Sequence, residues 1–248
     1  MKPIIISLVT VGNLKYPLNF DDLKKWPSAL FKIEHGASIG QIPNAQGTDN
    51  DEWEYPKEQL RKIIHREPSG DITFALINAP LEGNYFMRRL GDNIVVLSLY
   101  EMAEIIRDAN FTIENYIIRN VYEIIVLFLG NQRTVPDSSS TWTHDEIRGC
   151  LFDMNANKSD IIFSMHNPTL CTQCRNRLLS AQIDSNVIPS LTHELKKLKK
   201  EFFFRMIEYV RAHPIWSLVI TAATALVLNL LASVIYDLVK YLIMTSSK

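Results

Sequence analysis

The stretch TIENYIIRNVYEIIVLFL, which runs from Thr112 to Leu129, predicts the helix around which the rest of the domain packs. Its C-terminal half is apolar on almost every face, which is typical of a helix buried on all sides. Arg119 and Glu123 interrupt the apolar run, and the uncharged part is shorter than the roughly 20 residues that a membrane span needs. We therefore expect the central helix of a soluble domain, ended by Gly130.

The chain before this helix contains three apolar, β-rich runs that predict buried strands. They are Ile4–Val11, Asp71–Asn78 and Asn93–Leu97. The spacing between them predicts short helices at 21–31 and 57–64, and a connection without regular structure at 81–92. Strands that alternate with helices favour an α/β domain. No GxGxxG follows the first strand and no GxxxxGK[ST] is present, so neither nucleotide-binding motif applies.

Four further elements are expected around and beyond the central helix. Ser98 and Glu101 have the spacing of a capping box, which predicts a helix that ends near Asp108. The other three are a short strand within 159–164, a helix over 171–181 and a long helix over 191–213.

The segment Ile215–Tyr236 predicts a membrane-spanning helix. It reads IWSLVITAATALVLNLLASVIY and contains no charged residue. About 20 apolar residues are enough to cross a hydrocarbon core of roughly 30 Å. The alternative is the central helix of a soluble bundle, which would normally carry a polar face.

Basic residues are concentrated before the predicted span, and this asymmetry predicts its orientation. Lysine and arginine near the ends of a span stay cytoplasmic. Those before Pro214 are Lys196, Lys197, Lys199, Lys200, Arg205 and Arg211, and those after Tyr236 are Lys240 and Lys248. We expect a single-pass protein of the cell membrane with a cytoplasmic N-terminal α/β domain (1–185), a basic amphipathic juxtamembrane helix (186–213) and a membrane helix with a short tail (214–248).

The predicted span also carries small and polar residues at every fourth position. They are Ser217, Thr221, Ala225, Asn229 and Ser233. Positions four apart share a helix face, and small residues there allow two helices to approach closely. The pattern predicts a homo-oligomer formed through this helix, and a plain anchor is the alternative. Expected partners are membrane lipid and an unknown ligand or protein, and the net charge of −1 argues against nucleic acid.

The chain has three cysteines, and their spacing predicts a structural zinc site. Cys171 and Cys174 form a CxxC motif at the start of a helix, and Cys150 precedes it. Structural Zn²⁺ takes four nitrogen or sulfur ligands in a tetrahedron, so one histidine completes the set. His144 is the expected fourth ligand and His166 the reserve. Ordinary buried thiols and a redox CxxC are the alternatives.

The order of strand, long central helix and Cys…CxxC, over roughly residues 70 to 180, resembles the archaemetzincins, metzincin-type zinc metalloproteases. This resemblance implies a zincin-like small sheet, a long central helix, a cysteine-bound zinc and a catalytic HExxHxxGxxH on the helix. This chain has the cysteines of the pattern. In the helical motif, Glu123 falls on the catalytic glutamate, but Tyr122 and Val126 fall on the two helical histidines and Gln132 falls on the third histidine.

This departure implies a degenerate site. Valine has no ligand atom, and a glutamate without a metal-bound water has nothing to activate. Glu123 is then expected on the helix surface or beside Arg119, one turn away. No HExxH and no GxSxG occurs anywhere in the chain. The sequence leaves open whether the protein is an enzyme. It favours a protein without catalytic activity.

Arg88 and Arg89 follow an aromatic pair between two predicted strands, where α/β folds often place ligands, so they are the predicted ligand-binding residues. The sequence favours a membrane-anchored, catalytically inactive, zinc-stapled sensor or effector that binds a ligand or partner and acts through self-associating membrane helices. By analogy with small membrane-anchored sensors, bacterial defence is one setting for it. The alternative is a membrane-tethered metal-dependent hydrolase or peptidase with an unrecognised active site.

Overall fold

The computed structural model describes residues 2–46, 53–137, 142–145, 148–198, 200 and 202–246. The chain divides into two compact units, Met1–Lys200 and Glu201–Lys248. Each unit is described by itself below. Lys199 and Lys248, on which the predicted orientation partly rests, lie outside the described residues.

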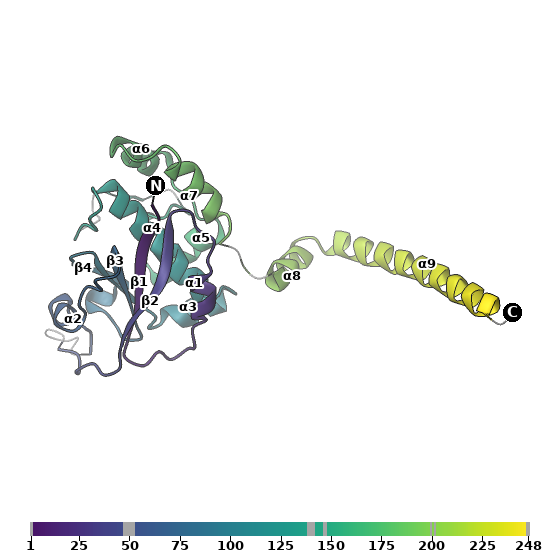
Figure 1. Ribbon diagram of the computed structural model, residues 1–248, viewed down its shortest axis with the longest axis horizontal. Coiled ribbons are helices and arrows are strands. Elements are labelled where there is room, and N and C mark those ends of the chain that lie inside the picture. Colours follow the sequence, from purple (N-terminus) through teal and green to yellow (C-terminus); the bar gives the residue numbers. More distant parts are fainter. Residues whose placement is uncertain are drawn as a thin grey trace. The chain divides into compact units, whose positions relative to one another are not determined.

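The first unit is built on one five-stranded sheet with the order β2-β1-β3-β5-β4 (Figure 1). Its strands are β1 (Ile4–Val11), β2 (Phe31–Ile39), β3 (Ile72–Ile77), β4 (Met87–Gly91) and β5 (Ile94–Ser98). β1 pairs in parallel with β2 and β3, and β3 pairs in parallel with β5. β4 is antiparallel to β5 and forms one edge of the sheet.

Helices cover the sheet and extend the chain beyond it. They are α1 (Phe20–Lys24), α2 (Lys57–Ile63), α3 (Met102–Asp108), α4 (Ile113–Gly130), α5 (Ile161–His166), α6 (Thr172–Ser180), α7 (Val187–Leu195), α8 (Phe202–Ala212) and α9 (Pro214–Ser246), with 3-10 turns η1 (Glu82–Asn84) and η2 (Lys158–Asp160). The result is the mixed α/β domain with a small sheet and a long central helix that the sequence predicts.

The sheet separates two apolar cores, because successive side chains of a strand point to opposite faces. In β1, Ile6 and Leu8 belong to the larger core, which contains α4, and Val9 and Val11 belong to the smaller core, which contains Leu60 of α2. The larger core extends from the sheet through α4 to the cysteines. The fold therefore places α4 between the sheet and the cysteine-containing segment.

Local chemistry sets both ends of α4. At its start, Thr112 Oγ1 accepts a hydrogen bond from Asn115 N at 3.1 Å, which caps the first turn. At its end, the Trp142 ring lies against Gly130, where a Cβ atom would stand 2.5 Å from Trp142 Cζ2. Only glycine fits beside this ring, so Gly130 both closes the helix and admits Trp142, two residues before His144.

The three predicted strands are confirmed by β1, β3 and β5, and the helices at 57–64, 112–129 and 171–181 by α2, α4 and α6. The helix predicted to end near Asp108 is confirmed by α3, and the helix predicted at 21–31 is the shorter α1. The sequence did not reveal β2, because Phe31–Ile39 has one buried end and an exposed, charged middle. It also did not reveal β4, which lies within the region predicted to be a connection.

Two predictions beside the helices are wrong. Ser98 ends β5 and donates its hydroxyl to Ala79 O at 2.6 Å, while Glu101 has φ 59° and makes no capping bond, so no capping box forms. The segment 159–164 is η2 followed by α5, where the capping pair Asn157 and Asp160 starts a turn. A buried apolar face alone did not distinguish this short helix from a strand.

The long helix predicted over 191–213 is two helices. α7 ends at Leu195 and α8 begins at Phe202. α7 belongs to the first unit, where Leu191, Glu194 and Leu195 are buried. The compact unit thus includes residues 186–200, which the sequence assigned to the juxtamembrane helix.

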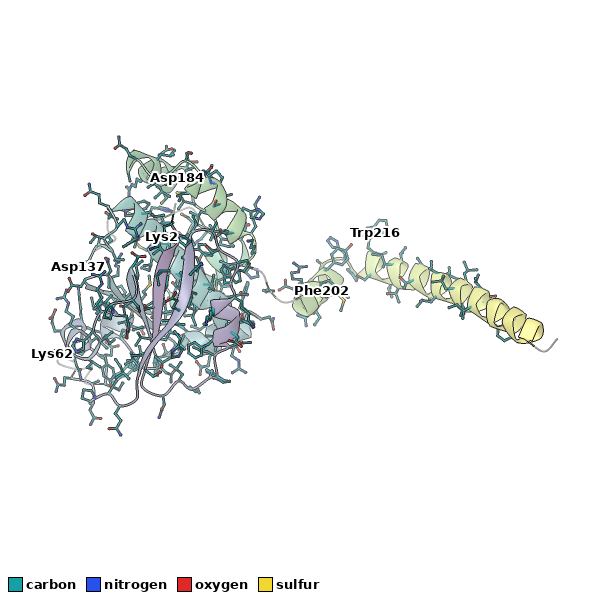
Figure 2. All side chains as sticks on the ribbon, in the orientation of Figure 1. Lys2, Lys62, Asp137, Asp184, Phe202 and Trp216 are labelled. Atoms are coloured by element: carbon teal, nitrogen blue, oxygen red, sulfur yellow. The ribbon has the colours of Figure 1, made fainter. Side chains whose placement is uncertain are left out.

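The second unit contains α8 and the 33-residue helix α9. Figure 2 shows side chains standing out along α9 from Trp216 onward. The segment Pro214–Tyr236 has mean hydropathy 2.3 and is not buried, and it is the candidate membrane span among the described residues. At roughly 34 Å for its 23 residues, it is long enough to cross a bilayer.

Candidate metal centre

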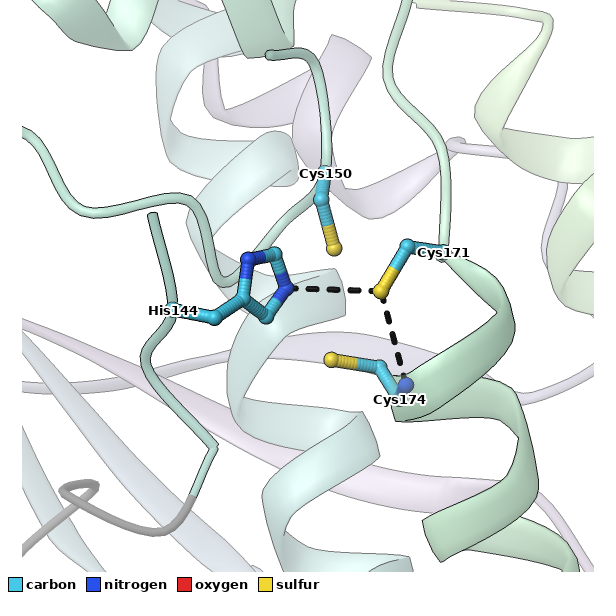
Figure 3. A group of neighbouring side chains, drawn as sticks. All are labelled: His144, Cys150, Cys171 and Cys174. Carbon is cyan, nitrogen blue, oxygen red and sulfur yellow. Dashed lines mark hydrogen bonds between the residues drawn. The ribbon is translucent and has the colours of Figure 1, made fainter. Parts of the chain in front are cut away.

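Four predicted zinc ligands meet in one cluster, hereafter the Cys₃His cluster. It consists of His144, Cys150, Cys171 and Cys174, drawn in Figure 3. One ligand atom from each side chain lies within 4.8 Å of all the others, and Cys171 Sγ is 3.4 Å from His144 Nε2. Sulfurs around a tetrahedral zinc lie about 3.8 Å apart, so the group is close to the size that Zn²⁺ requires.

Backbone hydrogen bonds hold the two loops that carry His144 and Cys150. His144 N donates to Phe152 O at 3.1 Å, and Met154 N donates to His144 O at 2.8 Å. On the other side of Cys150, Leu151 N donates to Thr169 O at 2.9 Å. The loop before the CxxC motif is thereby joined to the Cys150 loop, which explains how cysteines 21 residues apart meet.

Gly149 allows this close approach of the two loops. Its φ is +91°, and a Cβ atom on it would stand 2.9 Å from Asn167 O. Both the left-handed conformation and the contact require glycine. The residue next to Cys150 is therefore fixed by the geometry of the cluster.

Cys171 and Cys174 are placed by the first turn of α6. Cys171 is the N-cap, and its Sγ accepts a hydrogen bond from Cys174 N at 3.5 Å. A helix N-terminus favours negative charge, so a thiolate is stabilised there. The hydrogen bond between the side chains of Cys150 and Cys174 lowers the pKa of Cys150 to about 5 and raises the pKa of Cys174.

The donor set fits a structural Zn²⁺ ion. All three cysteines are buried free thiols, and none forms a disulfide. His144 Nε2, 3.4 Å from Cys171 Sγ, is the ring nitrogen that faces the thiols (Figure 3). An imidazole nitrogen beside three thiols is the donor set of a Cys₃His zinc site. When bound, zinc joins the two loops and α6 through Cys150, Cys171, Cys174 and His144.

The reserve ligand His166 does not belong to the cluster. It ends α5, is exposed, and its ring lies edge-on to Phe111 at 5.1 Å between centroids. Cys171 and Cys174 contribute to a four-donor group, which favours metal binding over a redox CxxC.

A second feature adjoins the cluster: a cleft between β4, α3, the middle of α4 and the segment 151–159. Its lining includes Arg88, Arg89, Glu123, Leu151 and Asp153. Glu123 is the residue that the resemblance placed on the catalytic glutamate. In this structure its carboxylate is paired with Arg119, as the sequence suggested.

The Arg119 side chain is buried, and each of its three guanidinium nitrogens donates a hydrogen bond. Its Nη1 donates to Glu123 and to Asn120 Oδ1, Nε donates to Ser164 Oγ at 2.9 Å, and Nη2 donates to Leu151 O at 2.7 Å. The guanidinium is 1% exposed and the Glu123 side chain 13% exposed. A buried guanidinium is therefore fixed beside Glu123, one helical turn before it.

The residues assigned to the histidine positions do not converge on this cleft. Tyr122 accepts from Trp26 Nε1 at 2.8 Å and donates to Glu194 Oε2 at 2.9 Å, which joins α4 to α7. Val126 is buried in the larger core, and Gln132 is exposed. The sequence missed the role of Glu194, which also accepts from Ser28 Oγ and Ala29 N. A lone glutamate within an apolar helix face was the only signal for it.

Arg88 and Arg89 occupy neighbouring positions of β4 and point to opposite faces of the sheet. Arg88 Nη2 donates to Glu82 O at 2.6 Å, and its guanidinium lies 3.9 Å from the Tyr85 ring centroid. Arg89 has a different environment, on the α4 side. The two guanidinium groups do not form one fork around a single ligand atom.

The residues of the predicted helix–helix interface lie on α9. Thr221 Oγ1 donates to Ser217 O at 2.8 Å, and Ser217 Oγ donates to His213 O at 2.9 Å, so these hydroxyls are satisfied within the helix. Ala225, Asn229 and Ser233 are exposed on the same helix.

No protein-family model matches this sequence, and neither does any curated protein. Two solved structures are similar to it. The archaemetzincin of Methanopyrus kandleri is 12% identical with a TM-score of 0.48, over 73% of this chain and 96% of that one. The archaemetzincin of Archaeoglobus fulgidus, complexed with malonate, is 13% identical with a TM-score of 0.43, over 70% and 99%.

Proposed function

We propose that this chain is a membrane-anchored, zinc-stapled binding domain without peptidase activity. One observation carries the proposal: the part of α4 that adjoins the cleft holds the Arg119–Glu123 ion pair and no metal ligands. In a zinc peptidase, two histidines four residues apart on one helix face hold the metal that activates water.

Arg119 and Glu123 have this spacing of four, but their chemistry is different. A guanidinium has five donors and no acceptor, so it cannot ligate a metal. Glu123 is already neutralised by Arg119. The pair supplies a fixed positive charge and directed hydrogen bonds, and it supplies no activated water.

The membrane part of the proposal rests on α9 and on charge. The apolar length of Pro214–Tyr236 supports insertion into the cell membrane. The basic residues before Pro214, such as Arg205 and Arg211, support a cytoplasmic first unit and contact with anionic lipid. The hydroxyls of Ser217 and Thr221 are bonded within the helix, whereas the structure describes no such bond for Asn229. This amide therefore supports self-association of α9.

The effect of the protein on the membrane then depends on the oligomer that α9 forms. Ligand or partner binding by the first unit alters the self-association of α9, as in a sensor or effector. A membrane-disrupting role in bacterial defence is the concrete form of this idea. Expression of the full chain should raise the permeability of the cell membrane to a small dye, and residues 1–200 alone should not.

The peptidase alternative is tested directly. The full chain in detergent, supplied with zinc, is incubated with a mixture of unstructured peptides with and without a chelator. We expect no cleavage above the level of the matched Glu123→Gln variant. Chelator-sensitive cleavage that this variant abolishes would overturn the proposal and establish the peptidase.

A further inference from the structure

Arg89 lies on the edge strand β4, opposite Val95 of β5. Val95 belongs to the larger core, on the sheet face covered by α4, so Arg89 projects toward this face and into the cleft. Its neighbour Arg88 is opposite Val96, which belongs to the smaller core. The two arginines therefore offer a natural comparison within one strand.

Arg89 is partly buried and lacks a partner among the described residues. Its Nη1 is buried and has no hydrogen-bond partner among the described residues, and no ion pair or ring contact involves it there. Burial lowers the pKa of Arg89, while the charges of Glu123 and Asp137 act in the opposite direction. A buried donor without an acceptor is destabilising, and more so when it is charged.

The carboxylates near Arg89 are already neutralised by other cations. Glu123 pairs with Arg119, and Asp137 lies 3.4 Å from Lys57 Nζ and 3.3 Å from Arg61 Nη2. The positive charge of Arg89 is therefore left uncompensated by the protein.

Other charged residues that line the cleft are paired as well. Lys15 Nζ lies 2.6 Å from Glu104 and Lys158 Nζ lies 2.9 Å from Glu101. Asp153 pairs with Arg148 at 3.4 Å. Within the described lining, Arg89 is the cation that has no carboxylate, carbonyl or ring partner.

We propose that Arg89 binds the carboxylate of a ligand that has a single negative charge and an apolar body. A guanidinium presents a planar fork that matches a carboxylate, and one uncompensated cation calls for one anion. Apolar side chains for the body are present in the same cleft, on Phe86, Met87 and Ile105. The inference rests on the proposed binding function and names its ligand class.

Polyanions fit this cleft less well. A phosphate group carries nearly two negative charges, and only one cation in the lining is unpaired. The site is therefore expected to prefer a carboxylate to inorganic phosphate.

The test uses three probes with the zinc-loaded full chain in detergent. They are 3-phenylpropionate, the neutral 3-phenylpropionamide of nearly the same shape, and inorganic phosphate, each followed by NMR line broadening or calorimetry. We expect the carboxylate to bind at least about tenfold more tightly than the amide, the ratio for a single charge-assisted pair. Phosphate should bind more weakly than the carboxylate.

Arg89→Met should abolish the preference for the carboxylate and Arg89→Lys should keep part of it. Arg88→Met should reduce the preference less, because Glu82 O and the Tyr85 ring already hold this guanidinium. Arg133→Met, outside the cleft lining, is the control that should keep it fully. Because Arg89 is a partly buried charge without a partner among the described residues, Arg89→Met should also raise the melting temperature, which shows that the variant is folded. Equal affinity for acid and amide, tighter binding of phosphate, no detectable binding, or an equal loss in Arg88→Met would overturn the inference. None of these results affects the peptidase assay, which tests the proposed function separately.

Discussion

Two neighbouring parts of this domain obtain their positive charge from different sources. In the Cys₃His cluster, four donors converge and the positive charge must come from a metal ion. Beside the cleft, the buried Arg119 supplies the positive charge that pairs with Glu123 of the cleft lining. The two meet at consecutive residues: Cys150 gives its thiol to the cluster, and Leu151 gives its carbonyl to Arg119 Nη2 at 2.7 Å.

This comparison distinguishes a structural metal site from a catalytic metal site. A tetrahedral site with four protein ligands has no open position for water, and it contributes to the free energy of folding. A guanidinium beside Glu123 stabilises that carboxylate without offering a coordination position. The described residues therefore place a zinc-binding donor set and an ion pair on α4 close together, and we propose that no water is activated at α4.

The largest expected effect comes from removing the metal site. A Cys171→Ser/Cys174→Ser variant should lose its zinc and its cooperative unfolding transition. Structural zinc sites contribute about 10–16 kcal/mol in small peptides, which is comparable to the whole stability of a domain, about 5–15 kcal/mol. Metal analysis of the purified protein and circular dichroism during heating measure both losses.

Histidine variants provide the matched control. His144→Ala should lower the zinc content in the same way, whereas His166→Ala should retain about one zinc per chain, because His166 lies outside the cluster. Equal zinc loss in both variants would contradict the assigned ligand set.

Breaking the ion pair of the cleft should have the next largest effect. Arg119→Met leaves Glu123 with an unpaired charge in a mostly buried position, which costs about 3–5 kcal/mol. Denaturant unfolding measures the change. The double variant Arg119→Met/Glu123→Leu should recover about half of the loss, because no charge is then left unpaired. Zinc content should stay unchanged in both variants.

Arg133→Met is the control for this experiment. Arg133 pairs with Asp71 at 3.0 Å, but its side chain is 52% exposed, so its loss should cost less than about 1 kcal/mol. An Arg119 variant as stable as the Arg133 variant would show that the buried pair is not the fixed element described above.

A smaller effect is expected at Tyr122, the position that the resemblance assigned to a metal ligand. Tyr122→Phe removes the acceptor of Trp26 Nε1 and one donor to Glu194, which should cost about 1–3 kcal/mol. Tyr116→Phe is matched, and it should cost less because the Tyr116 hydroxyl makes one longer bond, 3.3 Å to Ser98 O. Comparable losses in the two variants would argue against a structural link from α4 to α7 through Tyr122.

The sequence predicted the central helix, three strands and all four members of the cluster, because each leaves a local signal. Apolar periodicity marks α4, and the CxxC spacing marks α6. The pairing of His144 with the cysteines followed from distance along the chain. These features depend on residues near one another in sequence.

What the sequence did not predict depends on contacts between distant segments. β2 and β4 are edge strands with polar outer residues, so their periodicity is weak. The bond from Glu194 to Ala29 N spans most of the chain, and the unpartnered state of Arg89 depends on how Glu123 and Asp137 are neutralised elsewhere. The opposite orientation of Arg88 and Arg89 required knowing that this segment is a strand.

The smallest expected effect concerns α9, far from either site in sequence. Asn229→Leu/Thr221→Leu should weaken self-association in detergent about fivefold, since hydrogen bonds between membrane helices contribute on the order of 1 kcal/mol. Leu218→Ala/Leu226→Ala, which leaves the polar positions intact, is the control. Analytical ultracentrifugation measures the oligomer size, and an unchanged size in the polar variant would reject the proposed interface.

The most direct test of a structural zinc site separate from the cleft is zinc X-ray absorption on the purified full chain, together with metal quantification. We predict about one zinc per chain, bound by three sulfurs near 2.3 Å and one nitrogen near 2.0 Å. A second zinc, or a zinc bound mainly by nitrogen and oxygen, would place a metal outside the Cys₃His cluster and contradict the separation between a stapled fold and a metal-free cleft.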